Sequence, residues 1–298
     1  MKPQNKAYLY AISAILLWST IASAFKVTLQ YINHYQLLLL ASFFSCLTLF
    51  VILIGQKKIS QLKELRLKDY IASAILGFLN PFLYYLTLLK AYSLLKAQEA
   101  GTLNYIWPIT LVLLSIPILK QKIGWKSVLA ILVSFLGIII ISTEGRITTL
   151  EFREPIGVSL AIGSSIFWAL YWIFNMKDKR DESVKLFVNF VFGTGYTFIF
   201  VLSYSGFELI NLNGLIGSFY IGLFEMGITF FLWLMALKYS ANTAKISNLV
   251  YISPFISLII ISILVGEKIL FATVAGLAFI VGGIILQQLS GRYRKKPV

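Results

Sequence analysis

The chain has 298 residues, of which 58% are hydrophobic and 13% are charged, and its mean hydropathy is +0.83. Soluble globular domains contain about 25% charged residues, so this composition excludes an ordinary soluble protein. The formal net charge of +14 would suit a nucleic-acid-binding protein. The basic residues, however, are spread over short segments between apolar stretches. We therefore expect no nucleic-acid partner.

Apolar stretches of about 17–25 residues follow one another along the chain, and each is long enough to cross a bilayer as a helix. We predict ten spans near residues 7–28, 35–55, 70–90, 97–119, 126–143, 156–176, 184–204, 213–237, 242–264 and 269–289. The segments between them are short, which indicates an all-α integral membrane protein. Pairs of small residues spaced by four predict close approach between helices, and they end at Gly77, Gly222 and Gly276.

The first span has features of a signal peptide. Lys2 and Lys6 precede an apolar run, and residues 22–24 (ASA) resemble a cleavage site. The apolar run is longer than a typical signal core, and its residues recur in the middle of the chain. We therefore expect this span to be retained.

Matching sequence pairs indicate that one five-span unit occurs twice. Residues 11–18 (AISAILLW) recur as residues 161–168 (AIGSSIFW), and residues 105–108 (YIWP) recur as residues 251–254 (YISP). We place the two copies at residues 1–146 and 147–298. Because each copy has an odd number of spans, the second must cross the membrane in the opposite orientation. Inverted repeats of this kind are typical of secondary transporters, which bind substrate near the midplane between the halves.

The distribution of basic residues predicts the orientation. With a cytoplasmic N-terminus and ten spans, the cytoplasmic side carries 20 of the 26 lysines and arginines and the other side carries 6. This asymmetry satisfies the positive-inside rule and predicts that both termini lie in the cytoplasm. The protein is then expected in the inner or plasma membrane of the cell. Attraction to anionic lipid is a secondary effect of the same charge.

Two spans at equivalent positions of the copies contain residues that interrupt an apolar helix. Asn80 and Pro81 lie near the middle of the third span, where proline predicts a kink. The matching residues 225–227 (EMG) lie in the eighth span, and Glu225 is ~18 Å deep, near the midplane. For Asn80 the alternatives are a structural kink and cavity lining. For Glu225 they are a neutral acid hydrogen-bonded to a neighbouring helix, and a residue that lines the cavity or couples protons.

The fourth span begins with several polar or amphipathic residues, among them Glu99, Thr102, Asn104 and Trp107. A helix that enters from the outer side with this polarity is predicted to face an aqueous vestibule. The second-copy residue that matches Glu99 is Lys245, near the cytoplasmic end of the ninth span. The two charges are either gates at opposite ends of a transport path or ordinary helix-end charges that reach the interface.

Two tryptophans occupy equivalent positions in the copies. Trp18 and Trp168 lie about twelve residues into their spans, too deep for the interfacial belt where tryptophan usually gathers. Stacked against a solute they would supply apolar area with a polar handle, whereas core packing is the alternative. The complete set of predicted cavity residues is Trp18, Asn80, Tyr84, Glu99, Asn104, Trp107, Trp168, Trp172, Glu225 and Tyr251.

Other patterns do not indicate catalysis, a cofactor or a metal. The single cysteine, Cys46, lies inside the second span and is expected to be a packed apolar thiol. The single histidine, His34, lies in the first outer loop and is expected to be solvated. Residues 193–195 (GTG) lack the third glycine and the preceding strand of a dinucleotide-binding loop. With no Ser/His/Asp set and no phosphate-binding loop, we expect neither an enzyme nor a bound cofactor or metal.

These motifs resemble the drug/metabolite transporter superfamily, in its ten-span form built from two EamA domains. The resemblance covers essentially the whole chain and rests on residues 17–20 (LWST), 104–108 (NYIWP), 167–171 (FWALY), 236–240 (ALKYS), 251–254 (YISP) and 266–268 (GEK). Residues 97–101 (AQEAG) followed by 104–108 look most like the subgroup of aromatic-amino-acid exporters. The resemblance implies a central cavity, alternating access and export of small metabolites.

One position departs from the family pattern. The first copy has Gln121 where the family commonly has a glutamate, as at Glu267 of the second copy. We expect the change to affect helix capping or interhelical pairing rather than substrate choice.

We therefore predict a secondary transporter that exports amino acids or similar amphipathic solutes by alternating access. A cavity rich in tryptophan and tyrosine suits such substrates, and its carboxylates would attract an ammonium group. The alternatives are a multidrug or quaternary-cation exporter, a lipid-linked flippase with a lateral opening, and a membrane-embedded enzyme. The expected partners are a small-molecule substrate and the bilayer, with the coupling ion, direction and oligomeric state left open.

Overall fold

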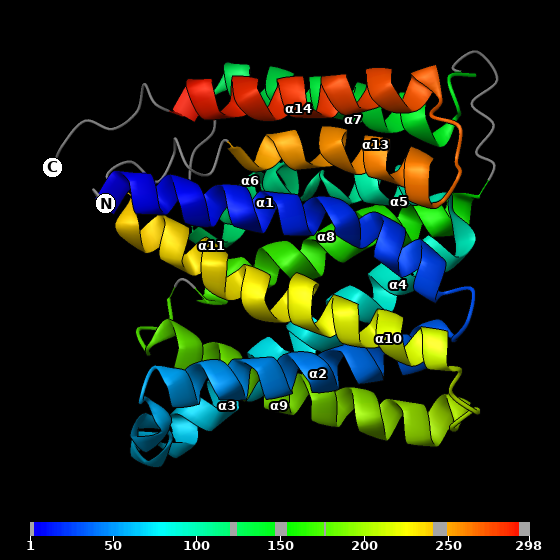
Figure 1. Ribbon diagram of the computed structural model, residues 1–298. Coiled ribbons are helices and arrows are strands. Elements are labelled where there is room, and N and C mark those ends of the chain that lie inside the picture. The colour runs from blue at the N-terminus through cyan, green and yellow to red at the C-terminus, as the bar shows by residue number, and fades with distance from the viewer. Residues whose placement is uncertain (1–2, 120–123, 147–153, 176, 241–248, 292–298) are drawn as a thin grey trace, which may run out of the picture.

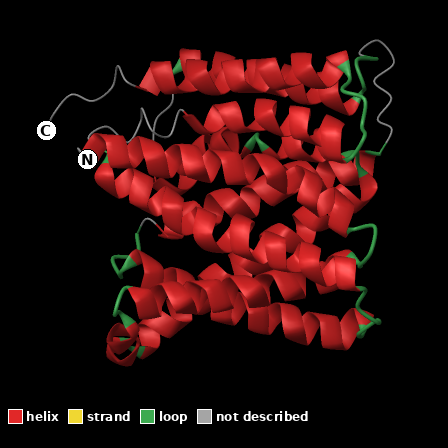
Figure 2. Ribbon diagram, viewed as in Figure 1, coloured by secondary structure: helices red, strands yellow, loops and turns green. Residues whose placement is uncertain are grey.

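The computed structural model describes residues 3–119, 124–146, 154–175, 177–240 and 249–291 (Figure 1). Within these ranges every regular element is a helix, and the helices lie roughly alongside one another (Figure 2). The predicted all-α fold is confirmed.

Seven helical segments are long and apolar enough to cross a membrane. They are built from α1 (Pro3–Thr28), α2 (His34–Gly55), α3 (Leu67–Gly77) with η2 (Phe78–Leu83) and α4 (Tyr84–Leu94), α5 (Ala97–Asn104) with α6 (Trp107–Leu119), α8 (Pro155–Asn175), α9 (Glu182–Phe200) with η3 (Val201–Ser205), and α10 (Leu212–Ile221) with η4 (Gly222–Gly227) and α11 (Ile228–Tyr239). Shorter apolar helices are α7 (Trp125–Ser142), η5 (Leu249–Ile252) with α13 (Ser253–Leu264), and α14 (Phe271–Gly291), while η1 (Ile59–Glu64) lies in a loop.

The predicted spans agree with these segments to within a few residues, except that the ninth is predicted to begin at residue 242, outside the described residues. The protein is therefore a multi-pass membrane protein, and the number of ten spans stays a prediction. His34 differs from expectation. It is the first residue of α2 rather than a solvated loop residue, its side chain is only 9% exposed, and its ring lies 3.8 Å from that of Tyr35.

When helices are matched between the two copies as predicted, each main contact of a helix recurs for its counterpart in the other copy. α1 packs against α11 and α13, and the matching helix α8 packs against α4 and α6. α2 packs against η4 and α10, and its counterpart α9 packs against η2 and α3. α7 pairs with α14 at one edge of the bundle, and α2 pairs with α9 (Figure 1). Each copy thus buries its first two helices against the later helices of the other.

The helix interruptions also match. The segments around Asn80 and Glu225 are both π-helical turns, η2 and η4. In η2 the backbone of Asn80 is non-helical, with φ −149° and ψ 121°, directly before Pro81. The predicted break at matching positions of the third and eighth spans is confirmed. π-Helical turns of this kind are frequent at functional sites.

Glycines permit the closest helix approaches. A Cβ on Gly222 would lie 2.5 Å from the carbonyl oxygen of Ala41 in α2. A Cβ on Gly276 in α14 would lie 2.7 Å from the carbonyl oxygen of Gly137 in α7. Gly77 of α3 approaches the backbone of α9 in the same way. The close approach predicted from the three small-residue pairs is therefore confirmed.

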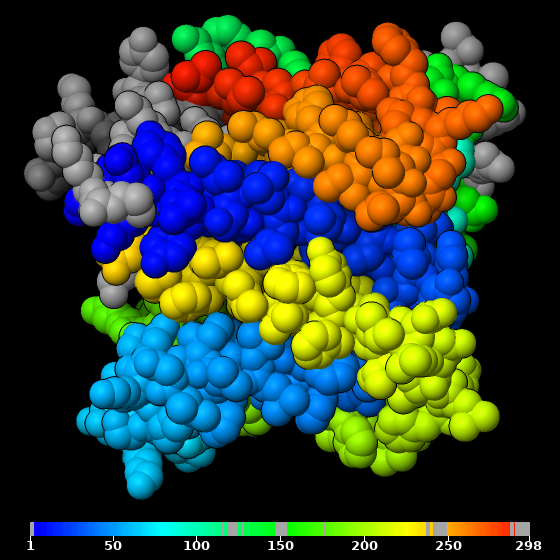
Figure 3. Space-filling model, viewed as in Figure 1, coloured from blue at the N-terminus to red at the C-terminus, as the bar shows by residue number. Residues whose placement is uncertain are grey.

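The outward surface of the bundle is apolar. Figure 3 shows one face covered by the side chains of α1, α2, α10, α11, α13 and α14. Large apolar side chains of these helices are well exposed, including Ile12 and Leu16 of α1 and Ile259 and Ile263 of α13. A contiguous apolar surface of this kind suits hydrocarbon rather than water.

Loops at the end of the bundle where α1 begins are joined by polar contacts. Lys58 forms an ion pair of 2.7 Å with Asp181, whose carboxylate also accepts hydrogen bonds from the first backbone N–H groups of α9. Burial alone would raise the pKa of Asp181, but these contacts more than offset it and hold the pKa below its usual range. Hydrogen bonds and charge from Arg180 likewise outweigh burial and lower the pKa of Asp178.

Candidate functional site

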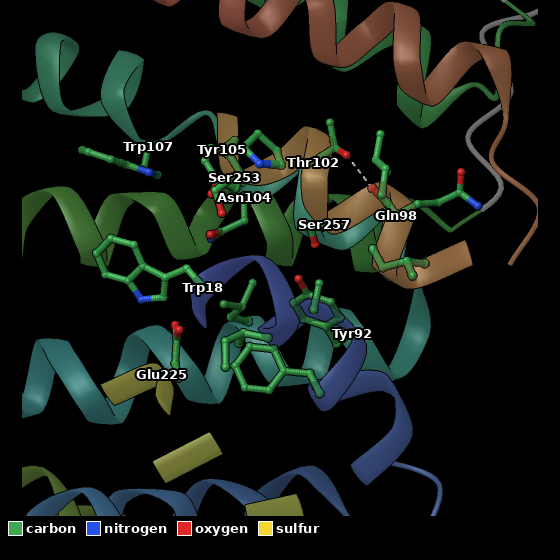
Figure 4. A pocket seen from close by; sticks show the side chains of 18 of the residues that line it. Trp18, Tyr92, Gln98, Thr102, Asn104, Tyr105, Trp107, Glu225, Ser253 and Ser257 are labelled. Atoms are coloured by element: carbon green, nitrogen blue, oxygen red, sulfur yellow. Dashed lines mark hydrogen bonds between the residues drawn. The ribbon is translucent and has the colours of Figure 1, made fainter. Parts of the chain in front are cut away.

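A cavity of about 110 Å³ lies between helices of both copies. Its lining comes from α1, α4, α5 and the start of α6 in the first copy, and from α8, η4, η5 and α13 in the second (Figure 4). The half-helices α6 and α13 begin at Trp107 and Ser253, which are matching residues of the repeated motif, and both residues line the cavity. The cavity is therefore built where helices of the two copies are interrupted.

Six of the ten predicted cavity residues line this space. They are Trp18, Tyr84, Asn104, Trp107, Trp168 and Glu225. They come from six separate elements and from both copies, so the fold brings together residues that are up to 207 positions apart in the sequence.

The other four predicted residues do not line the cavity. Asn80 is fully buried in η2, which packs against α8 and α9, so its position fits the structural kink. Glu99 faces the end of the bundle, where its carboxylate lies 3.9 Å from the Lys96 ammonium group. Trp172 packs behind Trp168, with 5.8 Å between ring centroids. Tyr251 is buried in η5 beside the lining.

Several lining residues were not predicted, among them Tyr92, Gln98, Thr102, Tyr105, Ser253 and Ser257. Their spacing carried a usable signal. Tyr84, Leu88 and Tyr92 recur every four residues and share one face of α4. Gln98 and Thr102 have the same spacing on α5, as do Ser253 and Ser257 on α13. Extending the prediction of Tyr84 along its helix face would have found Tyr92, whereas Gln98 and Ser257 share no helix face with a predicted residue.

Aromatic rings from five helices, α1, α4, α6, α8 and α11, meet at the middle of the bundle. The Trp18 ring lies 5.4 Å from the ring of Trp233 and 6.3 Å from that of Phe230 in α11. The Trp168 ring lies 4.7 Å from Tyr84, 5.8 Å from Phe230 and 6.4 Å from Trp107. Trp168 is only 9% exposed. Cavity lining and core packing are therefore not exclusive alternatives for these tryptophans.

Glu225 borders the cavity and is 8% exposed. Its Oε1 atom accepts a hydrogen bond of 2.9 Å from the hydroxyl of Tyr85, which is fully buried in α4. Within the described ranges, no ion pair joins Glu225 to a basic side chain. Figure 4 shows its carboxyl group on the same side of the cavity as Trp18. The hydrogen bond to a neighbouring helix and the cavity position, predicted as alternatives, occur together.

Asn104 is held in a defined orientation. Its Oδ1 atom accepts a hydrogen bond of 3.1 Å from the Tyr84 hydroxyl, and its Nδ2 group donates one of 3.1 Å to Ser164 in α8. At the matching interface of the other copy, the hydroxyls of Ser19 and Ser253 are hydrogen-bonded at 3.0 Å. Such pairs join helices across the two copies without needing an apolar driving force.

A polar network lies at the end of the cavity near the start of α5. The Glu267 carboxylate accepts hydrogen bonds of 2.8 Å and 3.2 Å from the backbone N–H groups of Ala97 and Gln98. The Gln98 side chain donates to the carbonyl of Lys268 at 2.9 Å and accepts from the backbone N–H of Leu270 at 3.1 Å. Glu267 thus caps α5 and ties it to the loop before α14. Gln121, its counterpart, lies outside the described residues.

Two lysines also form polar contacts at this end of the bundle. The Lys26 ammonium group donates to the carbonyl oxygens of Tyr92 and Leu95 at 3.1 Å and 2.6 Å, and Lys96 forms an ion pair of 2.6 Å with Glu144. Lys245, the predicted partner gate of Glu99, lies outside the described residues. The hypothesis of two matched gates therefore stays a prediction.

Comparison with known proteins identifies the family. Residues 5–143 and 155–287 each match the EamA-like transporter family. The chain belongs to this family of membrane transporters.

Relatives extend over nearly the whole chain. An uncharacterized transporter of Clostridium kluyveri is 25% identical over 97% of this chain and 94% of its own length. The aromatic amino acid exporter YddG of Escherichia coli is 23% identical over 97% of this chain and 99% of its own length. A solved crystal structure with 20% identity superposes with a TM-score of 0.67 over 96% of this chain and 98% of that one, which establishes a shared fold.

Proposed function

We propose that the protein is a secondary transporter that exports small organic metabolites, amino acids or similarly amphipathic solutes, by alternating access. The observation that carries this proposal is the cavity built from interrupted helices of both copies. A space between repeats, lined by aromatic and polar groups at half-helix ends, is where secondary transporters bind their substrates. Trp18, Tyr84, Asn104 and Trp168 are proposed to contact the solute.

We propose ten spans arranged as two inverted copies, residues 1–146 and 147–298, with both termini in the cytoplasm. Figure 1 supports this arrangement, because α1 begins and α14 ends at the same end of the bundle. α1 and α8 run in opposite directions there. The basic loop that contains Lys63 and Arg66 and the loop that contains Lys179 and Arg180 lie at that same end.

The cavity position suggests how access would alternate. The cavity extends from the aromatic cluster of Trp18 and Trp168 toward the end of the bundle where Gln98 lies. We propose that this cluster is the barrier toward the end where α1 begins, and that the Glu267 network is the barrier at the other end. Typical ligand pockets measure about 300–1,000 Å³, so the cavity must widen to take a solute. We propose that α1 and α11, and by symmetry α8 and α4, separate alternately.

Glu225 is proposed as the residue that couples protons, because it is a buried acid at the cavity without a basic partner in the described part of the chain.

A lipid-linked flippase, the alternative function, would need a lateral opening between helices. Leu258 borders both the cavity and an apolar groove between α13 and α14, and its side chain stands between the two spaces. Lipid movement is therefore an alternative outcome of the test below.

The test is a counterflow screen in liposomes that contain the purified protein, with amino acids, nucleosides, sugars and cationic dyes as solutes. We expect exchange of one solute class well above that of protein-free liposomes. Trp168→Leu should reduce the exchange, whereas Trp125→Leu should not, since Trp125 lies at a helix end and is 72% exposed. Absence of exchange with every class, or translocation of a fluorescent lipid instead, would overturn the proposal.

Orientation is tested separately by labelling with an impermeant maleimide in a Cys46→Ser background. Lys63→Cys, in the loop between α2 and α3, should react only after the membrane is made permeable. Asn211→Cys, before α10, should react on intact cells. The opposite pattern would place the termini outside.

A further inference from the structure

We infer that the cavity selects solutes by charge and takes organic ammonium ions with an aromatic or apolar part, in preference to zwitterions and carboxylates. The inference rests on the proposed transport function and concerns the same cavity. It narrows the proposed group of solutes to amphipathic amines and ranks amino acids, which are zwitterions, below them.

The charge of the cavity lining is the first argument. Among the described residues that line it, Glu225 is the one acidic side chain, and there is no lysine, arginine or histidine. The remaining ionisable groups are the phenols of Tyr84, Tyr92 and Tyr105. An ammonium ion that enters this space finds a carboxylate partner, while a carboxylate ion finds no cation. Moving an unpaired charge out of water is costly, so the lining disfavours anions.

The geometry of Glu225 leaves room for a ligand. One carboxylate oxygen, Oε1, accepts the hydrogen bond from Tyr85, which approaches from outside the cavity lining. The described structure gives no hydrogen bond to Oε2. The Tyr85 contact fixes the carboxylate, and the second oxygen can accept a charge-assisted hydrogen bond from an ammonium group.

The aromatic rings of the cavity lining favour the same charge. Trp18, Tyr84, Trp107 and Trp168 all border the cavity. Ring faces attract cations, most strongly those of tryptophan, and they also pack against the apolar part of a solute. A protonated amine with an aromatic group therefore satisfies both the carboxylate and the rings.

The lysines at the end of the cavity near the start of α5 already have partners. Lys26 donates to two backbone carbonyl oxygens at the end of α4, and Lys96 pairs with Glu144. Glu99 and Glu267 also interact with Lys26 and offset its charge. These lysines cannot pair with a solute carboxylate inside the cavity without breaking contacts that hold the end of the bundle.

The starts of the half-helices α6 and α13 are positions that would favour an anion, because helix N-termini attract negative charge. They offer few donors here, since Pro108 and Pro254 directly follow their first residues. Pro254 has no N–H group, and the Ser253 hydroxyl is hydrogen-bonded with Ser19. A solute carboxylate bound at either helix start would appear in the test as transport of the zwitterion or the acid.

The test compares solutes that share a ring and differ in charge. Counterflow is measured in liposomes with phenethylamine, phenylalanine and 3-phenylpropionate, and with trimethylphenethylammonium to separate attraction to the rings from hydrogen bonding. We expect phenethylamine to exchange about ten- to hundredfold more readily than 3-phenylpropionate, the range of one charge-assisted hydrogen bond. Phenylalanine should fall between them.

Glu225→Gln provides the decisive variant, because glutamine keeps the shape and can still accept from Tyr85. It should abolish the preference for the amine, and size-exclusion chromatography and circular dichroism check that it folds. Glu99→Gln is the matched control, since Glu99 lies outside the cavity lining, and it should keep the preference.

The outcomes separate the inference from the proposed function. Preferred exchange of phenylalanine or 3-phenylpropionate, or an unchanged preference in Glu225→Gln, would refute charge selection by this cavity while leaving transport intact. Exchange of none of the four solutes, with exchange of another class in the wider screen, would refute the inference and keep the transporter. No exchange of any solute class would contradict both.

Discussion

Replacing Glu267 by glutamine should loosen the end of the cavity near α5. In the wild-type protein the carboxylate accepts two backbone hydrogen bonds at the start of α5, at 2.8 Å and 3.2 Å. Hydrogen bonds to charged groups contribute about 1.5–3 kcal/mol and neutral ones about 0.5–1.5 kcal/mol. Glutamine keeps one acceptor oxygen but loses the charge, which also interacts with the helix dipole. We expect a loss of ~1–2 kcal/mol in the stability of this closure.

Two measurements check this expectation. The apparent Tm of the purified protein should fall by ~2–8 °C, given ~2–4 °C per kcal/mol for chains of 150–250 residues. In a Cys46→Ser background, Ser257→Cys reports access to the cavity from the end where Gln98 lies. Its reaction rate with an impermeant maleimide should rise about five- to thirtyfold, the factor that corresponds to 1–2 kcal/mol.

Glu154→Gln is the control, because Glu154 is an exposed acid directly before α8, outside this network. It should change neither the apparent Tm nor the labelling rate. If Glu267→Gln leaves both quantities at the wild-type value, the carboxylate does not hold this end closed. A lower Tm with unchanged labelling would show a cap that stabilises α5 without controlling access.

Three further substitutions test the packing and polar contacts. Gly193→Ala should destabilise the protein by ~1–3 kcal/mol, because the added methyl group overlaps the proline ring of η2. Gly195→Ala should be neutral, since its Cβ meets nothing within 4 Å. Equal Tm values for the two variants would refute this expectation. Asp181→Ala should cost ~1–2 kcal/mol of stability through the lost cap of α9, and Asp181→Asn, which keeps the cap, should cost less than half of that. Because the pKa of Asp181 is lowered, its contribution to stability is present at neutral pH and is lost as the pH falls through that lowered value. A difference in Tm that does not change with pH would contradict this expectation. Tyr85→Phe should lower the apparent Tm by removing the donor to Glu225 at a cost of ~1–3 kcal/mol, and an unchanged Tm would show that the bond adds nothing.

Particular residues show how much of the fold and of the site could be predicted from the sequence. Composition and hydropathy predicted an all-helical membrane protein, because each span must satisfy its own backbone hydrogen bonds within the bilayer. The repeated motif at residues 105–108 and 251–254 indicated the doubled unit, and the structure places the half-helix starts Trp107 and Ser253 within it. Polar residues at depth identified Glu225, since an ionisable group there is costly and therefore marks packing or function.

The same reasoning failed where facing direction matters. Asn80 and Glu225 occupy matching π-helical turns, yet Asn80 is sealed between helices and Glu225 borders the cavity. Trp168 lines the cavity while Trp172, one turn away, packs behind it. Helical periodicity relates residues on one helix, but it does not say which face another helix will cover.

The sequence by itself determined the helices, their interruptions and the doubling of the unit, because these depend on local hydropathy, proline and glycine. Only the tertiary structure decided which polar groups meet. Tyr85 and Glu225 are 140 positions apart, and their hydrogen bond exists because α4 and η4 both pack against α2. Glu267 and α5 are joined across 170 positions in the same way. The copies share a scaffold, and the contacts between them set the charge and shape of the cavity.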